Sequence, residues 1–179
     1  MTFKLMSAFA LSLSAQALVL TAQSQETFKD RLQLNPNETC STGVPEPGDV
    51  VAFALKGAKG RNYAIAGNSE TARLAIRGEA NSVFNVFQVL PAAEEGSVAL
   101  YSLGHQQFVT MDDKTRLFAT SGPESALLFQ LEDASEGYFR IKVHGYPTWM
   151  RMNVNGYLDF RSKQAEAATS FCAQIVTSD

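Results

Sequence analysis

The feature that most constrains this chain is a pattern that occurs three times. Three phenylalanines recur at a constant interval of about 42 residues, a period typical of one supersecondary unit: Phe87, Phe129 and Phe171. Upstream of them, three leucines keep nearly the same period: Leu74, Leu117 and Leu158. Aromatic residues recur further upstream with a similar spacing: Tyr63, Phe108 and Trp149. A unit of this size cannot bury its apolar face alone. Three copies therefore predict a closed threefold assembly rather than an open solenoid.

Each copy holds four short segments with the features of β-strands, and helical periodicity is absent from this part of the chain. In the segment 138–143, for example, the polar residues Arg140 and Lys142 alternate with the apolar residues Phe139 and Ile141. The twelve predicted strands are 50–55, 62–66, 73–77, 84–90, 98–103, 107–111, 116–120, 127–131, 138–143, 148–154, 157–161 and 170–176.

Glycine and short polar residues mark the joints between these strands. The clearest joint is Asn155-Gly156. It predicts a two-residue hairpin because both residues tolerate a positive φ. Twelve short strands in three four-stranded units predict an all-β fold, the β-trefoil. Six of its strands close a barrel, which removes exposed sheet edges, and three hairpins cap one end.

The repeat also resembles a known family. Gly60-Arg61-Asn62-Tyr63, followed by Leu74 and Phe87, resembles the repeat of fascin-type β-trefoils. The resemblance covers about residues 50 to 177 and rests on core-packing motifs, so it implies the fold and little about function. The Gln-x-Trp signature of ricin-type trefoil lectins is missing, because Pro147 and Thr148 precede Trp149, the only tryptophan.

The first residues have the composition of an export signal. Lys4 supplies a positive charge, residues 5–20 are mostly apolar and small, and Ala22-Gln23-Ser24 fits a cleavage site. We expect residues 1–24 to be a secretory signal peptide, 25–49 to be a lead-in and 50–179 to form the trefoil domain. The apolar stretch is too short and interrupted for a membrane span, so we expect a secreted or periplasmic protein without membrane insertion.

The two cysteines, Cys40 and Cys172, are expected to form a disulfide. Export places them in an oxidising compartment, where an even pair is typical of a disulfide. The first and last strands of a closed trefoil barrel are also neighbours, which brings the two cysteines near each other. Two buried free thiols are the alternative.

Charge and motifs exclude several classes of function. The net charge of −3 gives no sign of the basic face that binding to nucleic acid or heparin would need. Catalytic motifs such as Gly-x-Ser-x-Gly and His-Glu-x-x-His are absent from the sequence. His105 and His144 lie at strand joints without a carboxylate cluster, so we expect exposed histidines and no metal or cofactor. The carboxylate pairs, Glu132-Asp133 among them, are predicted to lie in solvated turns. We therefore expect a protein that is not an enzyme.

The third repeat carries the residues most suited to a ligand site. An aromatic ring beside planar polar side chains is typical of sites for hydroxyl-rich ligands. The candidate ligand-binding residues are Trp149, Arg151, Asn153, Asn155, Tyr157 and Asp159. The matched positions of Tyr63 and Phe108 favour an alternative for Trp149, which is packing in the core under the hairpin cap. An inward Trp149 would also shield Arg151 and Asn153.

Function follows from this pattern only by analogy with the fold. We expect a secreted binding module that holds a carbohydrate or glycoconjugate through its loops, as a lectin does. One alternative is a protein-binding module, such as an inhibitor of an extracellular protease. The fascin resemblance implies another, the bundling of actin, but a single exported trefoil is unlike the intracellular, multi-trefoil fascins.

Overall fold

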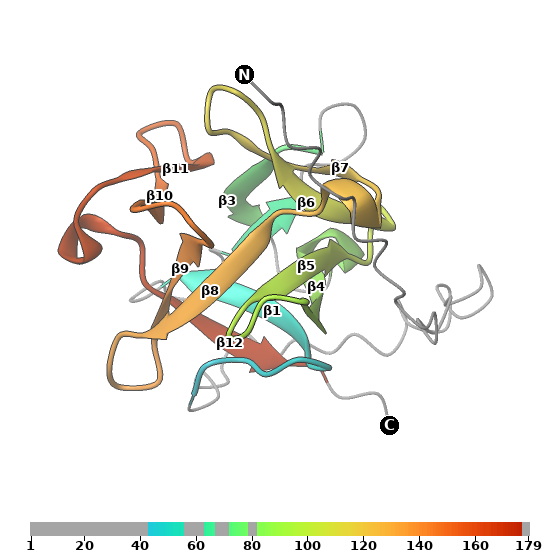
Figure 1. Ribbon diagram of the computed structural model, residues 1–179, viewed down its shortest axis with the longest axis horizontal. Helices are drawn as coiled ribbons and strands as arrows, with labels where there is room; N and C mark the ends of the chain where they lie inside the picture. The colour runs from blue at the N-terminus through green and yellow to red at the C-terminus, as the bar shows by residue number, and fades with distance from the viewer. Residues whose placement is uncertain (1–42, 56–62, 67–71, 79–81, 177–179) are drawn as a thin grey trace, which may run out of the picture.

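The computed structural model describes residues 43–55, 63–66, 72–78 and 82–176. The expected signal peptide, most of the lead-in and Cys40 lie outside these residues. The described chain is all-β (Figure 1). Its strands are β1 (Val50–Leu55), β2 (Tyr63–Ala66), β3 (Leu74–Gly78), β4 (Val86–Pro91), β5 (Val98–Ser102), β6 (Gln107–Met111), β7 (Leu117–Ser121), β8 (Leu128–Asp133), β9 (Phe139–Val143), β10 (Trp149–Met152), β11 (Leu158–Ser162) and β12 (Phe171–Ile175).

All twelve predicted strands are present, with ends that shift by one or two residues in most cases. The sequence predicted strands and turns only, and the structure adds short helical turns. Three single-turn 3-10 helices precede β4, β8 and β12: η1 (Val83–Asn85), η2 (Pro123–Ser125) and η3 (Ala165–Ala167). Phe84, predicted to begin a strand, lies in η1 because Ser82 caps this turn by accepting a hydrogen bond from the Phe84 backbone N–H.

Six strands close a barrel by antiparallel pairing. The order around the barrel is β1, β4, β5, β8, β9, β12 and back to β1. The closing pair, β1 with β12, runs in continuous register from Val51↔Ile175 to Leu55↔Phe171. Closure leaves none of these six strands with a free edge, which removes a route to edge-to-edge aggregation.

The remaining strands form three hairpins, β2–β3, β6–β7 and β10–β11. Each hairpin is joined to the next by an isolated antiparallel bridge. The backbone hydrogen bonds at these three bridges include Ala119 N to Ala72 O at 2.9 Å, Phe160 N to Thr115 O at 3.2 Å and Ile76 N to Gly156 O at 2.8 Å. The three acceptor residues Ala72, Thr115 and Gly156 all have positive φ, 42°, 63° and 77°. Each of the three contacts between hairpins therefore uses the carbonyl of a residue in the left-handed conformation.

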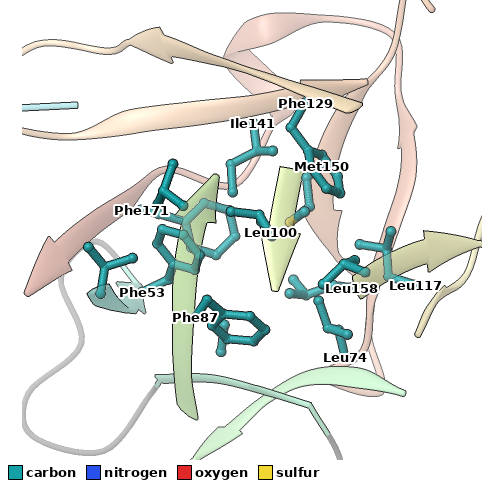
Figure 2. Packing of buried hydrophobic residues seen from close by; sticks show 14 of the residues in the cluster. Phe53, Leu74, Phe87, Leu100, Leu117, Phe129, Ile141, Met150, Leu158 and Phe171 are labelled. Carbon is teal, nitrogen blue, oxygen red and sulfur yellow. The ribbon is translucent and has the colours of Figure 1, made fainter. Parts of the chain in front are cut away.

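The core fills the space between barrel and cap. Phe87, Phe129 and Phe171, which mark the sequence repeat, have exposed fractions of 1%, 0% and 0%. Figure 2 shows Phe53 among the core rings, and its centroid lies 5.6 Å from that of Phe87 and 5.7 Å from that of Phe139. Burying a side chain of this size contributes about 1.5–3 kcal/mol, so these rings stabilise the closed barrel.

The turn between β10 and β11 differs from the predicted two-residue hairpin. Gly156 N donates to Asn153 O at 2.9 Å, and Asn153 N donates to Tyr157 O at 2.9 Å. The turn thus spans four residues, and Asn155 is not at positive φ, whereas Gly156 is. The cause is the Asn153 side chain, whose Oδ1 accepts from the backbone N–H of Asn155 at 2.9 Å and of Tyr157 at 3.2 Å. Such a side-chain bond favours an Asx turn over the two-residue form.

Candidate functional site

Trp149 lies on the outer face of its sheet, so the alternative that it packs in the core is wrong. Its neighbour Met150 is 1% exposed and belongs to the core, whereas Trp149 is partly exposed. The reason is strand alternation, which points successive side chains to opposite faces. The same alternation buries Val109 and leaves Phe108 partly exposed in β6.

The indole of Trp149 reaches across a neighbouring strand. Trp149 in β10 pairs with Lys142 in β9, and β9 pairs on its other side with β8. The Trp149 Nε1 donates a 2.7 Å hydrogen bond to Oε2 of Glu132 in β8. The indole therefore lies over the outer face of β9, and its edge is fixed by a charge-assisted bond.

Lys142 completes this arrangement. Its Nζ lies 3.6 Å from Glu132 Oε1 and 5.1 Å from the centroid of the Trp149 ring. A cation at this distance is attracted to the indole face. Glu132 was predicted to lie in a solvated turn, and this prediction is wrong, because Glu132 and Asp133 are the last residues of β8.

Arg140 stands beside these groups without an ion-pair partner among the described residues. It lies on the outer face of β9, two residues before Lys142, and is directly paired in register with Glu132. The Glu132 carboxylate is nevertheless engaged by Trp149 and Lys142. Within the same part of the chain, the buried Arg140 Nε has no hydrogen-bond partner. We call Glu132, Arg140, Lys142 and Trp149 the Trp149 cluster.

A second polar group lies at the β10–β11 hairpin. Asp159 is only 3% exposed. Its Oδ1 accepts from Arg151 Nε at 3.0 Å, and its Oδ2 accepts from Asn153 Nδ2 at 3.4 Å. A buried carboxylate needs such partners, because an uncompensated buried charge is strongly destabilising. These three candidate residues are brought together, and their polar atoms bond largely to one another.

Asn155 and Tyr157 belong to the same hairpin, but their side chains are not bonded to the Asp159 carboxylate. Asn155 is exposed on the turn. The ring of Tyr157 stacks with Arg73 from the first hairpin, whose guanidinium carbon lies 3.8 Å from the ring centroid. The six residues predicted for one site are thus divided between the hairpin and the Trp149 cluster.

Sequence reasoning did not select three members of the Trp149 cluster. Glu132, Arg140 and Lys142 come from β8 and β9, which precede the strand of the tryptophan in the chain. The alternation of Arg140 and Lys142 along β9 was a usable signal that both face outward. The strand order β8, β9, β10 was needed to place them beside Trp149.

The two histidines have protein partners. The Oγ of Ser97 lies 2.8 Å from Nδ1 of His144, and Ser97 is buried. The ring of His105 lies 5.0 Å from that of Phe84. Both histidines are partly exposed rather than fully exposed as predicted. In the described ranges, no group of three or more His, Cys, Asp or Glu residues is placed to hold a metal ion.

Cys172 is buried in β12, and the described residues include no free cysteine. Because Cys40 lies outside them, its pairing with Cys172 stays a prediction. Where the structure describes the chain, it contains no helix of the length and apolarity that a membrane crossing requires.

No family model and no curated protein sequence matches the chain. Several solved structures are similar to it in fold. A ricin B-like lectin of Macrolepiota procera in complex with lactose is 11% identical, with a TM-score of 0.60 over 73% of this chain and 97% of that one. A lectin of Polyporus squamosus bound to a human-type influenza-binding epitope is 9% identical, with a TM-score of 0.60 over 73% of this chain and 50% of that one.

A designed threefold-symmetric protein, ThreeFoil, is 9% identical, with a TM-score of 0.56 over 69% of this chain and 96% of that one. At such identities the likeness speaks for the fold alone, since one fold supports many functions. Together with the closed six-stranded barrel, it shows that the chain folds as a β-trefoil, whereas the fascin-like type stays an expectation.

Proposed function

We propose that this protein is a secreted, non-enzymatic carbohydrate-binding module, and that Trp149 is the surface on which the sugar stacks. The observation that carries the proposal is the fixed, partly exposed indole, with the Glu132 carboxylate bonded to its N–H edge and the Lys142 ammonium 5.1 Å from its ring centroid. The similarity to lectins in complex with lactose or with a human-type influenza-binding epitope supports the same class of ligand.

The physical argument starts from the chemistry of a sugar. A pyranose has apolar C–H groups on one face and hydroxyls around its edge, so it fits an aromatic ring bordered by hydrogen-bonding groups. The carboxylate of Glu132 accepts hydrogen bonds, and the ammonium of Lys142 donates them. Because the Trp149 Nε1 is already bonded to Glu132, little side-chain freedom is lost when a sugar binds, and such preorganisation favours affinity.

We extend the proposal to the other parts of the chain. Export by residues 1–24, the Cys40–Cys172 disulfide and a chain built from three equivalent repeats all fit an extracellular lectin. Within the site, we assign sugar contact to the Trp149 cluster. We assign Arg151, Asn153 and Asp159 chiefly to holding the hairpin, because they bond to one another.

A specific surface feature favours a second candidate, binding to a protein. Val154, at the tip of the β10–β11 turn, is 101% exposed, and Met152 and Tyr146 are 39% and 56% exposed. Exposed apolar side chains such as these are available for a contact with another protein. A protease-inhibitor assay and an actin-sedimentation assay cover the two forms of this alternative, inhibition and bundling.

The test is a glycan-array screen of the protein purified from an oxidising expression host, followed by calorimetric titration of the best sugar. Trp149→Ala should abolish binding, whereas Tyr146→Ala, which removes an exposed aromatic ring nearby in the chain, should retain it. Circular dichroism shows that both variants are folded. A folded protein that binds no glycan, or a Trp149→Ala variant that binds normally, would refute the proposal.

A further inference from the structure

We infer that the sugar bound at the Trp149 cluster is anionic, with a carboxylate or sulfate group that pairs with Arg140. This inference rests on the proposed function and concerns the same site. It goes beyond that proposal because Trp149 and Glu132 alone suit a neutral sugar as well.

The first step is the charge balance of the cluster. Arg140 and Lys142 bring two positive charges, and Glu132 brings one negative charge, which Lys142 already faces at 3.6 Å. Glu132 also sits directly opposite Arg140 on the neighbouring strand. This register would allow an ion pair between Glu132 and Arg140. The Glu132 carboxylate contacts Trp149 and Lys142 instead. The positive charge of Arg140 is therefore not neutralised within the cluster.

The second step is the state of that guanidinium. The Arg140 side chain makes no ion pair, hydrogen bond or ring contact with another described residue, and its buried Nε lacks a partner there. Among the guanidinium nitrogens of Arg140, Nε alone is both buried and without a hydrogen-bond partner in the described residues. The two terminal nitrogens are therefore accessible to solvent. A fixed guanidinium edge is the protein group best matched to a planar carboxylate or to a sulfate, through two parallel hydrogen bonds.

The third step is position. Trp149 faces Lys142 across the β9–β10 pair, and its indole spans β9 towards Glu132, which is the strand partner of Arg140. The unpaired guanidinium thus lies at the border of the stacking surface. A neutral sugar on Trp149 leaves Arg140 unpaired, whereas an anionic substituent at the ring edge pairs with it in a partly buried setting, where electrostatic attraction is weakly screened.

The other charged groups near the cluster do not oppose this assignment. Asp133 ends β8 and is exposed, and its Oδ1 accepts from the backbone N–H of Ser135 at 3.1 Å. The buried carboxylate of Asp159 is occupied by Arg151 and Asn153.

The experiment titrates the full chain with three oligosaccharides of equal length: a neutral one, a uronic-acid one and a sulfated neutral one. We expect at least one acidic oligosaccharide to bind about tenfold more tightly than the neutral one, a difference typical of hydrogen bonds to a charged group. The uronic-acid and sulfated arms separate the two sources of negative charge. The preference should decrease as salt is raised.

The decisive variant is Arg140→Gln, for which the ratio of acidic to neutral affinity should fall to about one. Arg140→Lys should give an intermediate ratio, because a point charge lacks the two-pronged geometry. The control is Arg161→Gln, an exposed arginine on β11 that bonds to Lys114 and Thr115, and its ratio should equal that of the unaltered protein. Thermal unfolding checks that each variant is folded.

Two failures are distinguishable. If the protein binds neutral and acidic oligosaccharides with equal affinity, or if Arg140→Gln keeps the preference, the inference about Arg140 is overturned and the carbohydrate-binding proposal stands. If no oligosaccharide binds, both are overturned.

Discussion

Trp149 and Glu132 are joined by a 2.7 Å hydrogen bond that passes over β9, the strand between them. The chain contains a single tryptophan, so tryptophan fluorescence reports on the surroundings of Trp149. We expect Glu132→Ala to free the indole edge, shift the emission to longer wavelength and increase quenching by acrylamide. The stability loss should be about 1 kcal/mol, because the bond is charge-assisted but partly exposed.

The matched control is Glu166→Ala, which removes an exposed carboxylate in η3. Its tryptophan emission should be unchanged. An emission spectrum of Glu132→Ala identical to that of the unaltered protein would show that the hydrogen bond does not form in solution.

A second prediction separates the hairpin from the Trp149 cluster. Arg151→Ala removes the closest partner of the buried Asp159 carboxylate, so it should lower the free energy of unfolding by about 1–3 kcal/mol. Its sugar affinity should stay within about twofold of the original, since we place the sugar on Trp149. The measurements are urea unfolding and calorimetric titration. A folded Arg151→Ala variant that no longer binds would move the site to the hairpin.

The strands and the core were predictable from sequence for a physical reason. Alternation and the recurrent phenylalanines follow from burial, and burial is decided locally along each strand. This is why Phe87, Phe129 and Phe171 lie in β4, β8 and β12 and are buried. The closure of the barrel followed from the number of repeated strands.

The sequence left the direction of Trp149 open, because its match to Tyr63 and Phe108 in the repeat favoured the core, whereas the polar residues around it favoured a ligand site. In β6 and β10 the residue after the aromatic one, Val109 or Met150, occupies the core. The rings of Phe108 and Trp149 lie on the outer face of their strands. Phe108, for example, packs edge-on against Tyr101 with centroids 5.1 Å apart. The partners of Trp149 depend on which strands are neighbours, and no local pattern contains that information.

The left-handed turns give a third prediction. Thr115 has φ 63°, a conformation that costs a β-branched residue about 1–2 kcal/mol, whereas glycine adopts it freely. Thr115→Gly gives up an exposed hydrogen bond from Arg161 Nε to its hydroxyl. We still expect a net gain of about 0.5–1 kcal/mol in the free energy of unfolding. Gly156→Ala, at φ 77° in the equivalent turn, should lose about 1 kcal/mol. Denaturant titration measures both, and a destabilised Thr115→Gly would refute the account of strain.

The β6–β7 turn gives a prediction about pH. The guanidinium of Arg116, which donates to Asp112 through Nε at 2.6 Å and also forms an ion pair with it, lowers the pKa of the Asp112 carboxyl. A depressed pKa in the folded state stabilises the protein above the ordinary pKa of aspartate, about 4, and this stabilisation is lost as pH falls through the folded value.

Asp112→Asn isolates this charge, because Asn153 shows that an amide oxygen caps the equivalent turn equally. The variant should unfold at a lower temperature than the unaltered protein at pH 7. The two melting temperatures should converge as pH falls below the lowered pKa of the Asp112 carboxyl. A difference that persists unchanged in acid would show that the effect comes from the turn geometry and not from the ion pair. High salt should reduce the difference at pH 7, since both groups are near solvent.

The last prediction concerns the ends of the barrel. Cys172 lies in β12 opposite Ala54 of β1, and Cys40 precedes β1 in the chain. A disulfide between them closes a loop of roughly 130 residues, which stabilises the fold by roughly 5 kcal/mol in the chain-entropy model. We expect no reactive thiol in the unfolded, unreduced protein and a large loss of stability on reduction. Cys172→Ala should match the reduced protein in stability, apart from the lost packing of the thiol. Two reactive thiols in the unreduced protein would refute the disulfide and favour buried free cysteines.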